Sequence, residues 1–180
     1  MSILITILLI IASLVALVLI IGLFMKKEYT IVRQVTINKP KQDVFNYIKY
    51  VKNQDDYSVW VKIDPLMKRE YTGTDGTVGF VSAWDSTNKK AGKGEQEIKG
   101  IKEGERVDLG LHFIKPFEGR SDAYLVTEPA AGNQTKVTWG LDGKMAYPMN
   151  IMLPIMNMEK LIGNDLETGL SNLKAVLEQT

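Results

Sequence analysis

The sequence predicts an α+β fold in which an antiparallel sheet packs on a long C-terminal helix, preceded by one transmembrane helix. Three observations predict it. The first 25 residues contain no charged side chain. Six short strand-like runs, separated by turn residues, follow between residues 66 and 143, and an amphipathic helix closes the chain. Links this short join antiparallel neighbours, because parallel strands need long crossover connections.

The apolar run from Leu4 to Phe24 is long enough to cross a bilayer. Roughly 20 helical residues span a hydrocarbon core about 30 Å thick. A core helix of a small soluble domain would show a polar stripe, and this run has none. The alternative is a cleaved signal peptide, which needs a basic start, a shorter apolar stretch and a small-x-small cleavage site. None of these is present before Lys26, so the sequence predicts an anchor.

The predicted boundaries are an anchor with a basic flank at residues 1–27 and one domain at residues 28–180. Basic residues follow the apolar run and none precedes it, so the domain is expected on the cytoplasmic side. The absence of cysteine agrees with that side and excludes disulfides. The net charge of +1 offers no strong field for nucleic acid, and no nucleic-acid partner is expected.

The domain opens with a β-branched run at residues 29–37 that predicts a strand. Asn38 is the expected start of a short amphipathic helix, and residues 53–60 predict a second short helix or a turn. The next strands are expected at 66–72, 77–85, 95–102, 106–113, 120–127 and 136–143.

The closing helix is expected at residues 156–178. Its apolar stripe recurs at helical spacing and comprises Ile162, Leu166, Leu170, Leu173 and Leu177. The sheet is the only large apolar surface on which this stripe can pack.

Several segments in this order resemble the START-like superfamily, also called SRPBCC, which includes polyketide cyclases/dehydrases and lipid-transport proteins. The segments that carry the resemblance lie at residues 35–45, 55–60, 77–84, 92–98 and 135–139, and the likeness spans residues 29–177. None of them is a catalytic fingerprint. The resemblance implies a helix-grip fold, in which the curved sheet wraps the long helix and leaves a cavity between them. The N-terminal anchor departs from the many wholly soluble members.

Such a cavity would be apolar with a few polar groups. The candidate lining residues are Trp60, Phe80, Trp84, Phe113, Tyr124, Trp139, Met145, Met149, Met152 and Met156. Methionine is flexible, so the cluster from Met145 to Met158 could adapt to varied guests and gate the cavity. The alternatives are that these methionines fill core under the final helix or touch the bilayer.

No catalytic constellation or metal site is expected from the sequence. His112 is the only histidine and cysteine is absent, which excludes Cys–His dyads and thiolate metal sites. No cofactor is expected. If the chain were an enzyme, Asp108, His112, Tyr124 or Asp142 would have to supply proton transfer from inside the cavity.

The leading functional hypothesis is a single-pass membrane protein that binds a small hydrophobic or lipid-like ligand without changing it. Two alternatives stay open. One is a cyclase- or dehydratase-like enzyme that uses an acid or base in the cavity. The other is a protein-interaction module of the kind found in the co-chaperone branch of the superfamily, which an exposed apolar patch on the sheet would favour.

Overall fold

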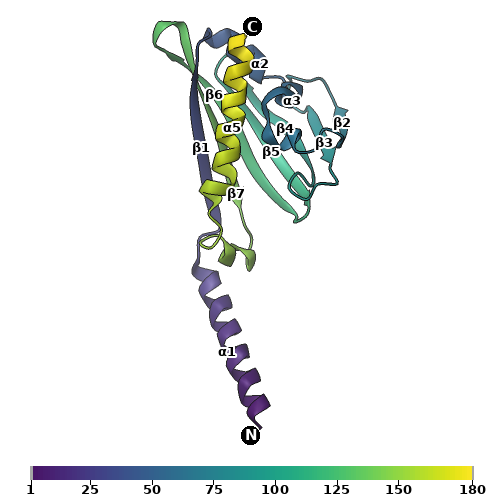
Figure 1. The fold of residues 1–180 in the computed structure, drawn as a ribbon, viewed down its shortest axis with the longest axis vertical. Helices are drawn as coiled ribbons and strands as arrows, with labels where there is room; N and C mark the ends of the chain where they lie inside the picture. The colour runs from purple at the N-terminus through teal and green to yellow at the C-terminus, as the bar shows by residue number, and fades with distance from the viewer. Residues whose placement is uncertain (1, 180) are drawn as a thin grey trace.

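A single long helix, α1 (Ile3–Phe24), opens the computed structural model, which describes residues 2–179. It projects away from the domain that the rest of the chain forms (Figure 1). Its mean hydropathy is 3.3 over the most apolar window, and none of that window is buried. Within α1 only Gly22 is buried, so this helix is not a core element of the domain.

The domain is built on one antiparallel sheet of seven strands in the order β1-β7-β6-β5-β4-β3-β2. The strands are β1 (Glu28–Ile37), β2 (Lys68–Thr72), β3 (Val81–Asp85), β4 (Lys93–Lys102), β5 (Arg106–Lys115), β6 (Gly119–Ala130) and β7 (Gln134–Lys144). A short 3-10 turn, η2 (Ala131–Asn133), joins β6 to β7. The first strand therefore pairs with the last, which brings the two ends of the domain sequence together.

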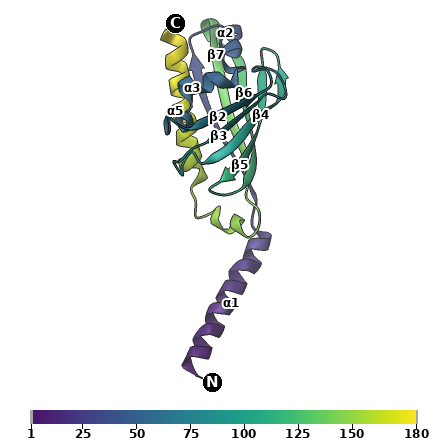
Figure 2. The ribbon, with the colours of Figure 1, turned by 90° about the vertical axis from the view of Figure 1, so that its right-hand side faces the viewer.

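The closing helix α5 (Met158–Gln179) lies along β1 and β7, as Figures 1 and 2 show. Its predicted stripe is confirmed: Leu166, Leu170, Leu173 and Leu177 are buried against the sheet. The other side of α5 contacts the short helices that follow β1. Strand β4 shifts register at Lys93/Gly94 and again at Ile98/Gly100. Such bulges bend a strand, which curves the sheet around the helix.

The segment between β1 and β2 contains α2 (Lys41–Ile48), η1 (Val51–Asn53), α3 (Gln54–Tyr57) and α4 (Val59–Lys62). The prediction of Asn38 as the helix start is wrong, because α2 begins at Lys41 with Pro40 in the N-cap position. The second short helix predicted at 53–60 is divided into η1, α3 and α4, with Ser58 in extended conformation between the last two.

The predicted strands are all present, with shifted ends. Strand β3 begins at Val81 and not at residue 77, because Gly76 and Gly79 adopt positive φ angles of 76° and 89° that turn the chain before it. Strands β4 to β7 extend beyond their predicted ends, since their antiparallel pairing continues almost to each turn. The connection between β3 and β4 is therefore residues 86–92, shorter than the predicted strand ends implied.

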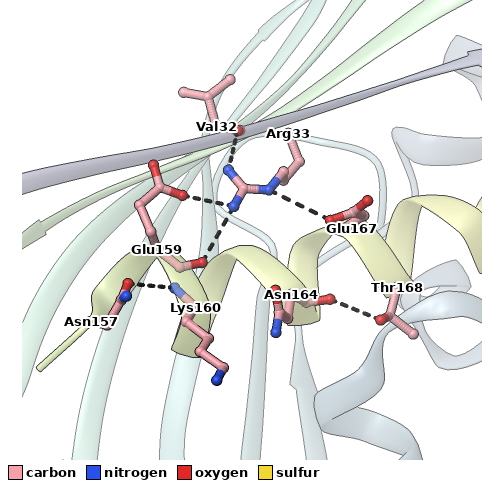
Figure 3. Close-up of polar contacts among 8 residues, drawn as sticks. All are labelled: Val32, Arg33, Asn157, Glu159, Lys160, Asn164, Glu167 and Thr168. Carbon is pink, nitrogen blue, oxygen red and sulfur yellow. Dashed lines mark hydrogen bonds and ion pairs between the residues drawn. The ribbon is translucent and has the colours of Figure 1, made fainter.

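The edge strand β1 is tied to α5 by polar side chains (Figure 3). The Arg33 guanidinium donates to the main-chain oxygen of Val32 at 2.9 Å and to Glu159 Oε2 at 2.7 Å. Farther along, Lys174 Nζ donates to the main-chain oxygen of Thr36 at 2.6 Å. Asn157 caps the start of α5 by accepting from the Lys160 amide. The opposite edge, β2, is only five residues long and begins with Lys-Arg-Glu.

Candidate functional site

A cavity of about 310 Å³ lies between the inner face of the sheet, the α3–α4 segment and α5. Strand alternation places its walls, because successive side chains point to opposite faces. Leu111 and Phe113 face inward from β5, and Trp139 and Leu141 face inward from β7. Their strand neighbours nearer the far end of the sheet, including Val107 and Leu109, are fully buried in the core. The cavity is thus the unfilled end of the same interior.

Aromatic rings form two sides of the cavity. Trp60 and Trp139 meet edge to face, with ring centroids 6.0 Å apart. Trp84 and Phe113 make a similar contact at 6.2 Å. Trp84 is also held by its indole N–H, which donates to the main-chain oxygen of Ala91 at 2.9 Å. Edge-to-face contacts between rings are energetically favourable, so they help to hold the aromatic walls of the cavity in place before a ligand binds.

Two glycines leave the space that the rings of Trp139 and Trp84 occupy. A Cβ atom on Gly169 of α5 would come within 2.8 Å of Trp139 Cζ3, so the indole packs directly on the helix backbone. A Cβ atom on Gly94 of β4 would meet Trp84 Cζ2 at 2.6 Å. Both distances are below ordinary van der Waals contact. Any larger residue at either position would move the ring and change the cavity.

Two glutamines line the cavity, and each has a side-chain nitrogen that is buried without a hydrogen-bond partner. The side-chain nitrogens of Gln54, from α3, and Gln96, from β4, are both inaccessible to solvent and unpaired. The hydroxyls of Ser58 and Ser82 lie on the same lining. Burying a donor without a partner costs about 1–3 kcal/mol, so a side-chain rotation that brings either amide to an acceptor in the cavity would be favoured.

Charged groups lie at the margin of the cavity. Asp55 and Arg69 form an ion pair that also lines a neighbouring hollow of about 360 Å³. Burial alone would lower the pKa of Arg69, but hydrogen bonds to Tyr71 and Asp55 outweigh it and raise that pKa. The guanidinium of Arg69 is therefore protonated at neutral pH.

The most exposed lining residues come from the ends of the strands and mark where the cavity meets solvent. Lys90 precedes β4, and Lys115, Pro116 and Phe117 lie at the turn between β5 and β6. Phe117 is 73% exposed. The exposed ring of Phe117 thus stands at the opening, which Lys90 and Lys115 also border.

Four of the ten predicted lining residues border the cavity: Trp60, Trp84, Phe113 and Trp139. Phe80 does not. It is 1% exposed and stacks on Tyr71 with ring centroids 6.0 Å apart, outside the cavity lining. Tyr124 lies on the outer face of the sheet, where its ring crosses Gly140 and packs under the Arg106 guanidinium at 4.3 Å. Its position in β6 alternates with the inward-facing Ala123 and Leu125, and this explains the difference.

The methionines Met145, Met149, Met152 and Met156 also lie away from the cavity lining. They belong to the connection between β7 and α5, which runs past the end of the sheet and contains the turn η3 (Met149–Met152). This connection contacts the C-terminal end of α1. The expected gate is therefore in the wrong place, because β7 carries the chain beyond the cavity before α5 begins.

None of the four acid–base candidates lines the cavity. Asp108 pairs with Arg106 at 2.7 Å, and His112 Nδ1 lies 3.2 Å from Glu95. Asp142 accepts from Thr30 Oγ1 at 2.6 Å. Together with Tyr124 these groups place charged and polar side chains on the outer face of the sheet. Within residues 2–179, no cluster of His, Cys, Asp and Glu could hold a metal ion.

Sequence reasoning missed several residues of the lining. Leu111 carries a signal, since it alternates with Phe113 on the inward face, and Ile162 and Leu166 belong to the recognised stripe of α5. Gln96 carries one too, because it shares a face of β4 with the buried Ile98, although glutamine is an ordinary surface residue. Gln54 carries none, and the packing of α3 over the sheet turns it inward.

No family model matches the chain, and no curated protein matches it. Solved structures do. A protein from Nitrosospira multiformis superposes with a TM-score of 0.59 at 15% identity, covering 82% of this chain and 94% of its own. Ara h 8.0201 gives 0.54 at 15% identity, covering 85% and 99%. The Aha1 dimer from Colwellia psychrerythraea gives 0.57 at 13% identity, covering 83% and 96%.

These neighbours share an antiparallel sheet folded around a C-terminal helix, and this chain has the same helix-grip fold. The fold implied by the sequence resemblance is thereby confirmed. At these identities the likeness concerns the fold, and function has to be argued from the cavity.

Proposed function

We propose that this chain is a membrane-anchored binding protein whose domain, residues 28–180, holds a small, mainly apolar ligand in the cavity. The observation that carries the proposal is a hollow of about 310 Å³ with aromatic walls and two unpaired amide nitrogens, those of Gln54 and Gln96. Ligand sites are typically apolar hollows of this size with a few polar groups that fix orientation.

The ligand chemistry follows from the lining. Apolar surface of the ligand is removed from water against Trp60, Trp139 and Leu111, which favours binding by about 25 cal/mol per Å². The amides of Gln54 and Gln96 select a ligand that carries a hydrogen-bond acceptor, such as a carbonyl or hydroxyl oxygen. The ligand is therefore an amphipathic molecule with a compact polar group, as in a lipid-like compound.

The anchor part of the proposal rests on α1. The helix has 22 residues, so at 1.5 Å per residue it is about 33 Å long, close to the thickness of a hydrocarbon core. It is exposed to its surroundings along nearly all of its length, whereas a core helix would be buried. Lys26 and Lys27 follow it, which favours a cytoplasmic domain by the positive-inside rule.

Tryptophan fluorescence of the full chain in detergent micelles tests ligand binding. All three tryptophans of the chain line the cavity, so an apolar dye bound there accepts energy from them. The probe is anilinonaphthalene sulfonate, and native mass spectrometry with lipid extract would then identify natural occupants. We expect saturable energy transfer that a bound lipid displaces.

Ala123→Phe is the decisive variant, because Ala123 is buried and lines the cavity from β6. A ring at this position should occupy the hollow and abolish saturable transfer. Val126→Phe is the matched control, since Val126 lies on the opposite face of the same strand. Equal dye binding by both variants would refute the proposal that the cavity is the binding site.

A further inference from the structure

The connection between β7 and α5 holds the end of the apolar helix by direct polar contact. Asn150 lies in the turn η3, is fully buried, and donates from Nδ2 to the main-chain oxygen of Gly22 at 2.7 Å and to that of Met25 at 3.3 Å. These carbonyls lie at the C-terminal end of α1, where the oxygen of Gly22 otherwise accepts only a long hydrogen bond from the Met25 amide at 3.4 Å. A side chain remote in sequence thus completes the end of α1.

Close packing accompanies the hydrogen bonds. A Cβ atom on Gly22 would lie 2.6 Å from Ile151 Cγ1, so the connection touches the α1 backbone where a glycine leaves room. Next to this contact, the Met145 amide donates to the main-chain oxygen of Lys27 at 2.8 Å, continuing the pairing of β1 with β7. The helix and the domain are therefore joined by two segments and not by a single linker.

The same connection leaves large apolar side chains uncovered around the junction. Met149 is 49% exposed, Met152 40% and Ile155 72%, and Phe24 at the end of α1 is 87% exposed. Soluble domains rarely expose a contiguous group of large apolar side chains of this kind. Lys26, Lys27 and Lys160 are exposed in the same region, which suits the anionic surface of a membrane.

We propose that the β7–α5 connection, residues 145–157, lies in the headgroup layer of the bilayer that α1 crosses and fixes the pose of the domain on it. This inference rests on the proposed anchor: if α1 spans the hydrocarbon core, its last turn is at the headgroup boundary. Ile151 touches that turn through Gly22, so the neighbouring exposed methionines and Ile155 lie at the same depth. Apolar side chains beside basic ones are typical of segments lying in the interface.

The pose has a consequence for the cavity. Antiparallel order puts the start of β1, the end of β7, the β3–β4 loop and the β5–β6 turn at one end of the sheet. That end is the one from which α1 projects (Figures 1 and 2). Lys90 and Phe117, which border the cavity opening, belong to these loops. The opening is thereby presented to the lipid surface, and the bilayer is the source of the ligand.

Single-cysteine labelling of the full chain tests the inference cleanly, because the sequence has no cysteine of its own. Ile155→Cys reports on the connection, Phe117→Cys on the cavity opening and Ala131→Cys on the opposite end of the sheet. Each is labelled with an environment-sensitive fluorophore in vesicles of phosphatidylcholine and phosphatidylglycerol, with spin-labelled lipids as quenchers. We expect strong quenching at 155, weaker quenching at 117, and none at 131.

Ala16→Cys in the middle of α1 separates the two proposals. Deep quenching at 16 with a solvent-like label at 155 would overturn the inference and leave the anchor standing. No quenching at 16 would overturn the anchor itself, and the inference with it.

The junction is tested by Asn150→Ala in the Ile155→Cys background, with Asn164→Ala on the exposed side of α5 as the matched control. Loss of the two hydrogen bonds should free the connection and lower the quenching at 155 at least twofold, while the control leaves it unchanged. Circular dichroism confirms that each variant is folded. Unchanged quenching in the folded Asn150→Ala protein would contradict the role given to Asn150.

Discussion

The two glycines of α5 offer a matched pair of substitutions in which the same atom meets different neighbours. In Gly169→Ala the new Cβ would lie 2.8 Å from Cζ3 of Trp139, a ring that is 4% exposed and held between sheet and helix. In Gly163→Ala it would clash with Nη2, the tip of the Arg33 side chain. A buried ring cannot move freely, whereas an arginine tip can swing toward solvent.

The magnitudes separate the two variants. Both substitutions gain about 1 kcal/mol of helix propensity. Gly169→Ala also overpacks the core, which typically costs about 1–3 kcal/mol, so a net loss of up to about 2 kcal/mol is expected. Gly163→Ala disturbs only the contacts of the Arg33 guanidinium with Val32, Glu159 and Glu167. Of these, the ion pair with Glu159, which is 61% exposed at its carboxylate end, is worth about 0.2–1 kcal/mol. The substitution should be neutral or slightly stabilising.

Urea unfolding of the full chain in detergent micelles, followed by tryptophan fluorescence and by near-ultraviolet circular dichroism, measures the difference. Gly169→Ala should be less stable than Gly163→Ala by about 1–2 kcal/mol, and only Gly169→Ala should change the aromatic dichroism, since only it moves Trp139. Equal free energies of unfolding would refute the conclusion that the indole packs rigidly on the helix backbone.

Three further predictions concern single side chains. Tyr57→Phe should leave stability unchanged or raise it by about 1 kcal/mol, because the buried hydroxyl has no partner; a clear loss in urea unfolding would reveal a hydrogen bond. Burial, with the nearby Tyr47 and Asp56, raises the pKa of Tyr57 above 10 in the folded protein. The contribution of its neutral hydroxyl to the free energy of unfolding is therefore fully present below pH 10 and is lost as the pH rises. Tyr57→Phe should accordingly unfold at a higher pH than the wild type in an alkaline titration. A hydrogen bond from the Asn38 amide, and a second one from Lys174, lower the pKa of Glu178 below 4.5. The contribution of this carboxylate to the free energy of unfolding is therefore present above pH 4.5 and is lost as the pH falls. Glu178→Gln should accordingly flatten the loss of stability during acid titration, and an unaltered acid profile would argue against the contact. Leu166→Ala, at a fully buried position of the cavity wall, should lower the free energy of unfolding by about 2–5 kcal/mol; a much smaller loss would show that the wall collapses around the gap.

Much of the fold could be predicted because its determinants are local and periodic. The spacing of Leu166, Leu170 and Leu173 sets the buried face of α5, and the alternation in β5 places Leu111 and Phe113 inward. The short turns then allow only antiparallel pairing of consecutive strands, because parallel strands need long crossover connections.

The site was harder to predict, because residue type does not determine which face of an element looks into a cavity. Tyr124 and Trp139 are both aromatic strand residues, and one lies outside and the other inside. Phe80 is apolar enough for a ligand wall but fills core, where it stacks on Tyr71. The Met149–Met152 turn depends on contact with α1, a partner more than a hundred residues away in sequence.

The two edges of the sheet matter most where many copies share one membrane. Anchoring confines proteins to a plane and raises their local concentration, and free strand edges then invite pairing between chains. Here the outward carbonyls of Val32 and Thr36 on β1 are already occupied by Arg33 and Lys174, and β2 presents a short charged edge. On the membrane surface that the proposed anchor implies, a neighbouring copy would meet these side chains along both edges, which disfavours strand pairing between chains.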